Sequence, residues 1–147
     1  HDPDIIMVGE VRDEETATMA LRAAMTGHLV LTTLHTNNAL SSPGRLLEMG
    51  VPGYLLASAL KLVIAQRLVR RLCPDCQDEY TPTIQETLLL NTLMKANTEG
   101  IKFRQGKGCS SCKMTGFIGR MGVYEFLEVN GPMMQALRQN DLQAYMK

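Results

Sequence analysis

Two short apolar segments, separated by one amphipathic helix, constrain the fold of this chain more than any other feature. Residues 5–8 (Ile-Ile-Met-Val) form a continuous apolar run, which is typical of a parallel strand buried on both faces. Residues 28–34 predict a second strand. Between them, Asp13 is placed to cap a helix that Gly27 ends. This strand–helix–strand order predicts a right-handed parallel crossover and therefore an α/β sheet.

The rest of the chain predicts mostly helices. One helix includes residues 45–49, and a longer one runs roughly from residue 54 to residue 72. Further along, we expect a helix over residues 83–97 and a strand over residues 122–129. A final amphipathic helix is expected to start at Pro132 and to continue to the C-terminus.

Each of the first two strands is followed by a residue suited to phosphate chemistry. Glu10 follows the first strand and His35 the second. Ligands bind at the carboxyl ends of parallel strands, where a nucleotide hydrolase needs a carboxylate near its attacking water and its magnesium. An ordinary loop carboxylate is the alternative for Glu10. His28 lies at the opposite end of the second strand, about 20 Å from His35, so a structural role or a contact with a neighbouring subunit is expected for it.

The four cysteines form two Cys-x-x-Cys pairs, Cys73/Cys76 and Cys109/Cys112, with 32 residues between the pairs. Two such pairs predict a tetrahedral zinc site with four thiolate ligands. Four thiolates leave no open coordination position, so the zinc would be structural and would pin an inserted hairpin or helix. Redox disulfides and inert buried thiols are the alternatives.

Charge and hydropathy exclude some functions. The 147 residues carry 15 basic and 15 acidic side chains, so the formal net charge is zero and gives no support to nucleic-acid binding. No apolar run reaches 18 residues, which argues against a membrane-spanning helix. Four arginines (Arg12, Arg67, Arg70 and Arg71) have two possible roles. Each either contacts neighbours or lies on a solvated face, and solvation is favoured because surface arginines are usually solvated.

Several motifs together resemble one family. Residues 2–13 (Asp-Pro-Asp-Ile-Ile-Met-Val-Gly-Glu-Val-Arg-Asp) and residues 26–37 are similar to the Walker B and histidine boxes of the ATPases of type II secretion and type IV pilus assembly. Residues 65–76 resemble the segment that joins the ATPase core to the family's tetracysteine subdomain, and residues 116–125 resemble the stretch after the second cysteine pair. Retraction-type pilus ATPases lack the tetracysteine element, so the resemblance favours the assembly and secretion branch.

The resemblance implies a fold and a domain organisation. It implies an α/β fold, in which a partial RecA-like parallel sheet with flanking helices carries a small tetracysteine zinc-stabilised subdomain. Residues 1–72 would be the C-terminal part of the RecA-like core. Residues 73–115 would be the zinc-binding insert, and residues 116–147 a C-terminal strand and helix segment.

The resemblance also implies a function. In this family a glycine replaces the usual Walker B aspartate, the next residue (here Glu10) acts in hydrolysis, and the histidine (here His35) senses the γ-phosphate. The cofactors would be structural Zn²⁺, held by Cys73, Cys76, Cys109 and Cys112, with ATP and Mg²⁺ in the intact protein. The partners would be the other subunits of a homo-hexamer and an inner-membrane platform protein, with no nucleic acid. The protein would be cytoplasmic and peripheral to the inner membrane.

The chain departs from the family in one respect. It contains no Gly-x-x-x-x-Gly-Lys-Ser/Thr sequence, which forms the phosphate cradle. The resemblance places that motif, the aspartate box and an N-terminal domain upstream. We therefore expect a C-terminal fragment of the ATPase that is inactive in isolation and has an exposed apolar sheet edge. The alternative is a non-enzymatic zinc-stabilised protein-interaction module, if the chain is complete as given.

Overall fold

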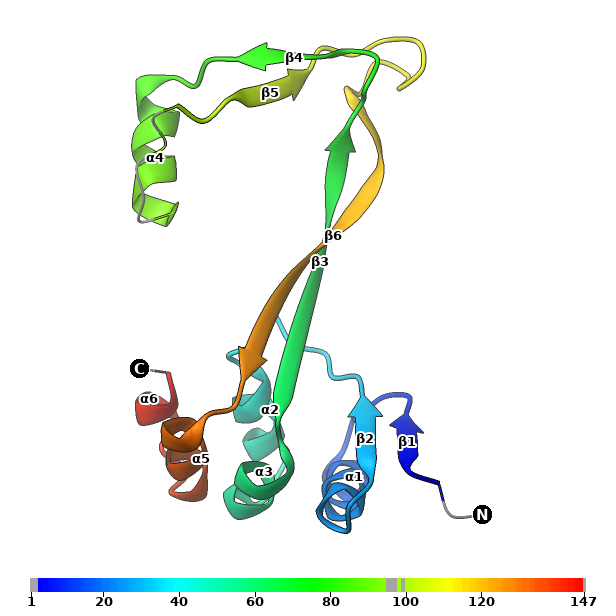
Figure 1. Cartoon of the computed structure of the whole chain (residues 1–147), viewed down its shortest axis with the longest axis vertical. Coiled ribbons are helices and arrows are strands. Elements are labelled where there is room, and N and C mark those ends of the chain that lie inside the picture. The colour runs from blue at the N-terminus through cyan, green and yellow to red at the C-terminus, as the bar shows by residue number, and fades with distance from the viewer. Residues whose placement is uncertain (1–2, 95–97, 99, 147) are drawn as a thin grey trace. The chain divides into compact units, whose positions relative to one another are not determined.

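The computed structural model describes residues 3–94, 98 and 100–146. The elements in chain order are β1 (Ile5–Val8), α1 (Glu14–Met25), β2 (Leu29–Thr32), α2 (Ser42–Glu48), α3 (Gly53–Ala59), β3 (Leu62–Leu72), β4 (Gln77–Tyr80), α4 (Ile84–Met94), β5 (Phe103–Gly106), β6 (Phe117–Glu128), α5 (Gly131–Arg138) and α6 (Leu142–Tyr145) (Figure 1). They form two compact units. Unit 1 comprises residues 1–67 and 124–147, and unit 2 comprises residues 68–123. The functional boundaries after residues 72 and 115 stay predictions.

In unit 1, the predicted parallel crossover is confirmed. β1 pairs with β2 in parallel, with Ile5 opposite Leu29 and Val8 opposite Thr32. The helix between them begins as expected, because the Asp13 carboxylate accepts a hydrogen bond of 2.8 Å from the Thr16 backbone N–H. The helix ends where Gly27 adopts a φ of +104°, a conformation that a side chain would strain.

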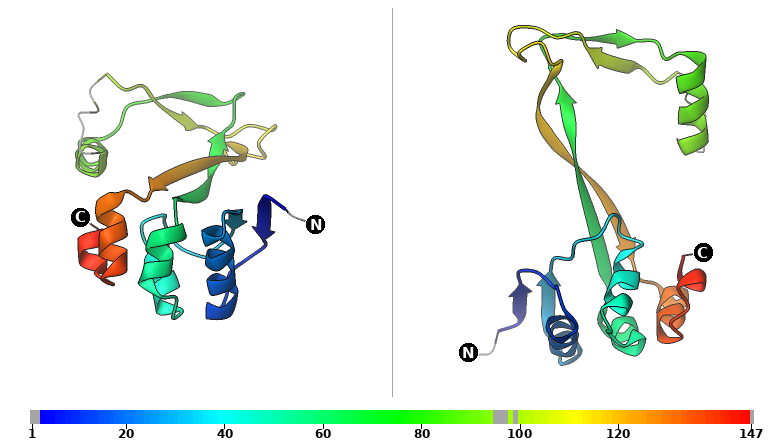
Figure 2. Two further views of the ribbon diagram at one scale, coloured as in Figure 1. Left: turned by 60° about the horizontal axis from the view of Figure 1, so that its bottom comes forward. Right: turned by 180° about the vertical axis from the view of Figure 1, so that it is seen from behind.

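The core of unit 1 lies among its helices. Figure 2 shows α1, α3 and α5 side by side in one layer. Leu56 of α3, Leu137 of α5 and Tyr145 of α6 belong to one buried cluster. α3 approaches α5 so closely that a Cβ on Gly53 would lie 2.1 Å from the Leu137 carbonyl oxygen. Val8, the last residue of β1, packs against this cluster.

The β1–β2 pair exposes apolar side chains, which agrees with the expected exposed apolar surface but not with burial of residues 5–8 on both faces. The exposed fractions are 60% for Ile5, 66% for Met7, 56% for Leu29 and 49% for Leu31. Central parallel strands are normally covered on both faces. β1 and β2 therefore expose more apolar surface than central strands of a sheet that is covered on both faces.

The long helix predicted over residues 54–72 is wrong. α3 ends at Ala59, and residues 62–72 instead form β3, which pairs with β6. The arrows of β3 and β6 point in opposite directions in Figure 1. β6 is also longer than predicted, since it begins at Phe117 rather than at residue 122. Pairing with a distant segment overrides the local preference of this stretch for a helix.

The C-terminal helix is divided in two. α5 ends at Arg138 and α6 begins at Leu142, with Asn140 between them at a φ of +55°. Asparagine is one of the few residues that tolerate this left-handed conformation. The Asp141 carboxylate then accepts hydrogen bonds from the first turn of α6. The single helix predicted from Pro132 onwards is therefore wrong.

In unit 2, an antiparallel hairpin and a helix lie between the two cysteine pairs. β4 pairs with β5, with Gln77 opposite Gly106 and Tyr80 opposite Phe103. α4 stands between these strands in the sequence and confirms the predicted helix as far as Met94. Residues 95–97 of that prediction lie outside the described residues.

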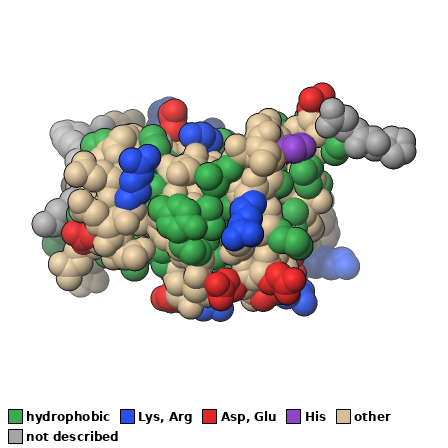
Figure 3. Space-filling model, turned by 90° about the horizontal axis from the view of Figure 1, so that it is seen from below, with side chains coloured by type: hydrophobic (Ala, Val, Ile, Leu, Met, Phe, Trp, Pro, Cys, Tyr) green, Lys and Arg blue, Asp and Glu red, His purple; other side chains and the backbone are tan. Residues whose placement is uncertain are grey.

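The face seen from below carries acidic and basic side chains interspersed with apolar ones, without dominance of either sign (Figure 3).

Within the part of the chain that the structure describes, every helix is too short or too polar to cross a bilayer.

Candidate functional site

The segments that carry Glu10 and His35 are joined at the carboxyl ends of β1 and β2. The Thr33 hydroxyl donates a hydrogen bond of 2.6 Å to the Gly9 carbonyl oxygen. The Val11 N–H donates one of 2.9 Å to the Thr33 carbonyl oxygen. These two bonds flank Glu10, so its backbone is fixed against the second strand.

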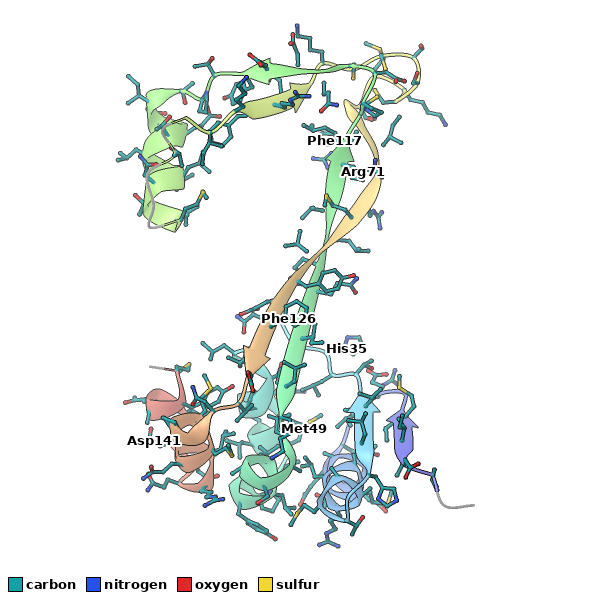
Figure 4. The ribbon with its side chains drawn as sticks, in the orientation of Figure 1. His35, Met49, Arg71, Phe117, Phe126 and Asp141 are labelled. Carbon is teal, nitrogen blue, oxygen red and sulfur yellow. The ribbon has the colours of Figure 1, made fainter. Side chains whose placement is uncertain are left out.

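The side chains of Glu10 and His35 meet at this edge. His35 Nε2 lies 2.8 Å from Glu10 Oε1. His35 projects from the loop that follows β2, and 91% of its side chain is exposed (Figure 4). The two residues that the sequence singles out are therefore brought together, with the imidazole open to an incoming ligand.

Arg12 also contacts Glu10, which the sequence reasoning missed. Its Nε donates a hydrogen bond of 2.7 Å to Glu10 Oε2, and its terminal guanidinium nitrogen lies 2.6 Å from the same oxygen. This hydrogen bond is the largest cause that lowers the pKa of Glu10, and the charges of Arg12 and His35 add to it against the effect of desolvation. The i, i+2 spacing was the available signal, because it places two side chains on one side of an extended segment.

A hollow of about 290 Å³ opens beside this cluster. It is lined by Glu10, Val11, Arg12, Leu34, His35, Arg45 and Met49. A second hollow of about 330 Å³ shares His35 and Arg45 with it. Arginine binds the oxygens of phosphates, and a carboxylate orients water or a magnesium shell. The arrangement can therefore hold an anionic ligand next to a carboxylate.

His28 lies elsewhere and makes local contacts. Its Nδ1 lies 3.0 Å from the Ala23 carbonyl oxygen and 3.1 Å from the Thr26 hydroxyl. Both partners belong to the C-terminal end of α1, where carbonyl groups lack partners within the helix. These contacts favour the structural interpretation of His28.

The four cysteine sulfurs form one cluster in unit 2. All four lie within 4.8 Å of one another, and all four thiols are free. Sγ–Sγ distances are 3.8 Å for Cys73 and Cys109, 3.9 Å for Cys76 and Cys112, and 3.7 Å for Cys109 and Cys112. A tetrahedral zinc site with Zn–S bonds of about 2.3 Å has S–S edges of about 3.8 Å. The donor set therefore fits zinc in type, number and spacing.

The local environment acts in opposite directions on two of these thiols. Burial raises the pKa of Cys76 to about 12. Burial acts in the same direction on Cys112, but hydrogen bonds to its sulfur from the Cys109 and Gly116 N–H groups bring its pKa down to about 6. Four thiolates cannot be packed together without an opposing charge, and a divalent metal supplies it.

Two of the remaining arginines also make contacts. Arg70 stacks on the Phe117 ring in unit 2, with 4.1 Å between its guanidinium carbon and the ring centroid. Arg67 donates a hydrogen bond to the Asn37 carbonyl oxygen in unit 1. Neither arginine is simply a solvated side chain.

The fold and the site define a class of protein. It is an α/β protein with a carboxylate and an imidazole at the carboxyl edge of a parallel strand pair, together with a tetracysteine unit. The sequence matches the family described as "Type II/IV secretion system protein" over residues 1–147. The chain belongs to that family.

Relatives and solved structures agree with this assignment. The chain is 43% identical to the type II secretion system ATPase E of Vibrio cholerae, over 92% of this chain and 26% of that protein. It is 47% identical to the type IV pilus assembly ATPase PilB of Pseudomonas aeruginosa, over 92% of this chain and 24% of that protein. The fold is similar to the pilus retraction motor PilT with bound ADP, with a TM-score of 0.58 and 31% identity over 97% of this chain and 30% of that one. The chain thus spans about a quarter of the length of these curated relatives.

Proposed function

We propose that this chain is the C-terminal part of an ATPase that powers type II secretion or type IV pilus assembly. The names of the relatives support this proposal, since they are secretion and pilus-assembly ATPases. The observation that carries it is the 2.8 Å contact between Glu10 and His35 at the carboxyl edge of β1 and β2. Side chains that follow both strands can contact a ligand bound at this edge.

In this proposal each residue of the cluster has one role. Glu10 orients the attacking water or the magnesium shell, and Arg12 holds its carboxylate in place by a hydrogen bond and an ion pair. His35 reads the γ-phosphate by a hydrogen bond. ATP and Mg²⁺ supply the reacting phosphate and the charge neutralisation that phosphoryl transfer requires. The phosphate cradle comes from a part of the protein outside these 147 residues, so the isolated chain is inactive.

The remaining assignments follow from the family and stay proposals. The four cysteines hold a structural Zn²⁺ that orders unit 2. The intact protein assembles as a homo-hexamer in the cytoplasm, peripheral to the inner membrane, and acts on an inner-membrane platform protein without nucleic acid. Residues 1–72, 73–115 and 116–147 then serve as core, zinc-binding insert and C-terminal segment.

Nucleotide-dependent protection from proteolysis tests the proposal. The 147-residue chain is digested with and without Mg-ATP, alone and with the upstream half of the ATPase supplied in trans. We expect protection around residues 10 and 35 only when the upstream half is present. Protection that is absent in both conditions would contradict the nucleotide site, and a Glu10→Gln, His35→Ala chain is the matched control.

A second candidate function is a zinc-stabilised module for protein interaction. α4 favours it, because none of its residues is buried and its large apolar side chains Ile84, Leu88, Leu89, Leu93 and Met94 are each more than half exposed. Exposed apolar surface of this kind marks interaction sites. The mass of the endogenous protein separates the two candidates. A mass several times 16.3 kDa favours the ATPase, and a native product of 16.3 kDa favours the module.

A further inference from the structure

The loop between His35 and α2 is ordered around Asn38. The Asn38 side-chain oxygen accepts a hydrogen bond of 2.8 Å from the Ser41 N–H, and its carbonyl oxygen accepts one of 3.2 Å from the Ser42 hydroxyl. The Thr36 and Ser42 hydroxyls are 2.8 Å apart. These hydrogen bonds tie the loop together, so a contact that fixes the loop also fixes the chain directly after His35.

Two charged side chains hold this loop from outside. Glu125 of β6 accepts a hydrogen bond of 3.0 Å from the Ala39 backbone N–H. Arg67 of β3 donates to the Asn37 carbonyl oxygen. Ala39 is fully buried, so loss of Glu125 would leave a buried N–H without this acceptor, which is costly. The two bonds fix two backbone groups that are only two residues apart.

The strand geometry explains why both side chains reach the same loop. Gln66 donates a hydrogen bond of 3.1 Å to the Tyr124 hydroxyl, which places these two side chains on one face of the β3–β6 pair. Successive side chains on a strand point to opposite faces. Arg67 and Glu125, each one residue further along, therefore project together from the other face.

We infer that Arg67 and Glu125 are positioning residues for His35. Thr33 fixes the chain before His35 against Gly9 and Val11, and Arg67 and Glu125 fix the chain after it. The imidazole is thus held at Glu10 from both sides, although its own side chain is almost fully exposed. This inference rests on the proposed function, since it assigns the two residues to placing the group that reads the γ-phosphate.

The test uses steady-state ATP hydrolysis by the full ATPase that contains this chain. We expect Glu125→Ala and Arg67→Ala each to lower kcat about tenfold or more, because a small misplacement of a catalytic group costs up to about a hundredfold in rate. KM for ATP should change much less. Glu125→Gln keeps an acceptor oxygen for the Ala39 N–H and should recover most of the lost kcat. Glu128→Ala removes an exposed carboxylate from the same strand and is the matched control.

A double-mutant comparison separates positioning from a general structural effect. In a His35→Ala background, a residue that acts only through His35 has nothing left to position, so Glu125→Ala and Arg67→Ala should lower kcat no further. An equal fold-decrease in both backgrounds would overturn the inference. So would full activity of Arg67→Ala, a change at an exposed side chain that leaves the core intact. If His35→Ala itself leaves kcat unchanged, the proposed function of the site fails instead.

Discussion

Gly106 and Gly116 approach each other so closely that neither position has room for a side chain. A Cβ added to Gly106 would lie 2.1 Å from the Gly116 carbonyl oxygen, and one added to Gly116 would lie 2.6 Å from that of Gly106. Gly116 also accepts a hydrogen bond of 2.9 Å from the Cys73 N–H. This close approach brings the end of β5, the first cysteine pair and the segment after the second pair together.

Substitution of Gly106 should therefore disrupt the cysteine cluster. We expect Gly106→Ala to push the two backbone segments apart and to lower the zinc bound per chain, measured by elemental analysis of the purified protein. Gly131→Ala is the control, because a Cβ there meets no atom within 4 Å. Full zinc occupancy in Gly106→Ala would show that the cluster does not depend on this contact.

Removal of the proposed zinc ion should disorder unit 2 and spare unit 1. Structural zinc sites contribute on the order of 10–16 kcal/mol of apparent binding free energy, whereas the core of unit 1 lies in residues outside 68–123. After chelation, protease cleavage should begin within residues 68–123. Cys112→Ser should give the same pattern without chelator. Cleavage that begins equally in both units would contradict this division.

Zinc binding at pH 7 should release protons. Without metal, unit 2 is expected to be disordered, and free cysteine thiols with an ordinary pKa of about 8.5 are mostly protonated at this pH. A coordinating thiol must lose its proton, so zinc affinity should fall as the pH falls. Calorimetric titration in buffers of different ionisation enthalpy measures the number of protons released. A value of zero would mean that all four thiols are already ionised.

Arg12→Ala should raise the pKa of Glu10 towards its ordinary value of 4.5, because the Arg12 hydrogen bond is the main cause that lowers it. A carboxyl group with a lowered pKa stabilises the folded state above its ordinary pKa, and this stabilisation is lost as the pH falls through the lowered value. The wild type should therefore keep the Glu10 carboxylate at a more acidic pH than Arg12→Ala does. An NMR pH titration of the Glu10 carboxyl carbon measures both values, and identical values would show that Arg12 has no such effect.

Truncation of the helical core should destabilise unit 1. Leu137 is fully buried where α5 packs on α3, so Leu137→Ala should cost about 2–5 kcal/mol in the free energy of unfolding. Leu62→Ala is the matched control, since 49% of Leu62 is exposed, and it should cost much less. Chemical denaturation followed by circular dichroism compares them, and equal losses would contradict the assigned core.

Local sequence signals predicted the first third of the fold well. β1, the Asp13 cap and the Gly27 terminus depend on nearby residues, and the apolar run before Glu10 was enough to place it at a strand end. The prediction failed where a distant partner decides the structure. Residues 62–72 pair with β6, and no helical or strand period within that stretch reveals a partner some 50 residues away. The break at Asn140 could be predicted from the sequence, because asparagine often ends a helix and Asp141 can cap the next one.

The site could be predicted from the sequence only in part, for a similar reason. The four cysteines and the Glu10–His35 pair carry recognisable residue types at strand ends or at ligand spacing. Arg67 and Glu125 act through backbone groups of a loop that is distant in the sequence. Neither residue therefore belongs to a recognisable sequence motif. Such contacts become visible only when the strands and the loop are placed together in space.

Steady-state ATP hydrolysis by the full-length protein carrying Glu10→Gln tests the proposed ATPase function most directly. Glutamine keeps the size of the side chain but removes the negative charge that orients the attacking water or the magnesium shell, so kcat should fall by about a hundredfold or more, while nucleotide binding is retained. A kcat within twofold of the wild type would contradict the account, because Glu10 would then take no part in the reaction.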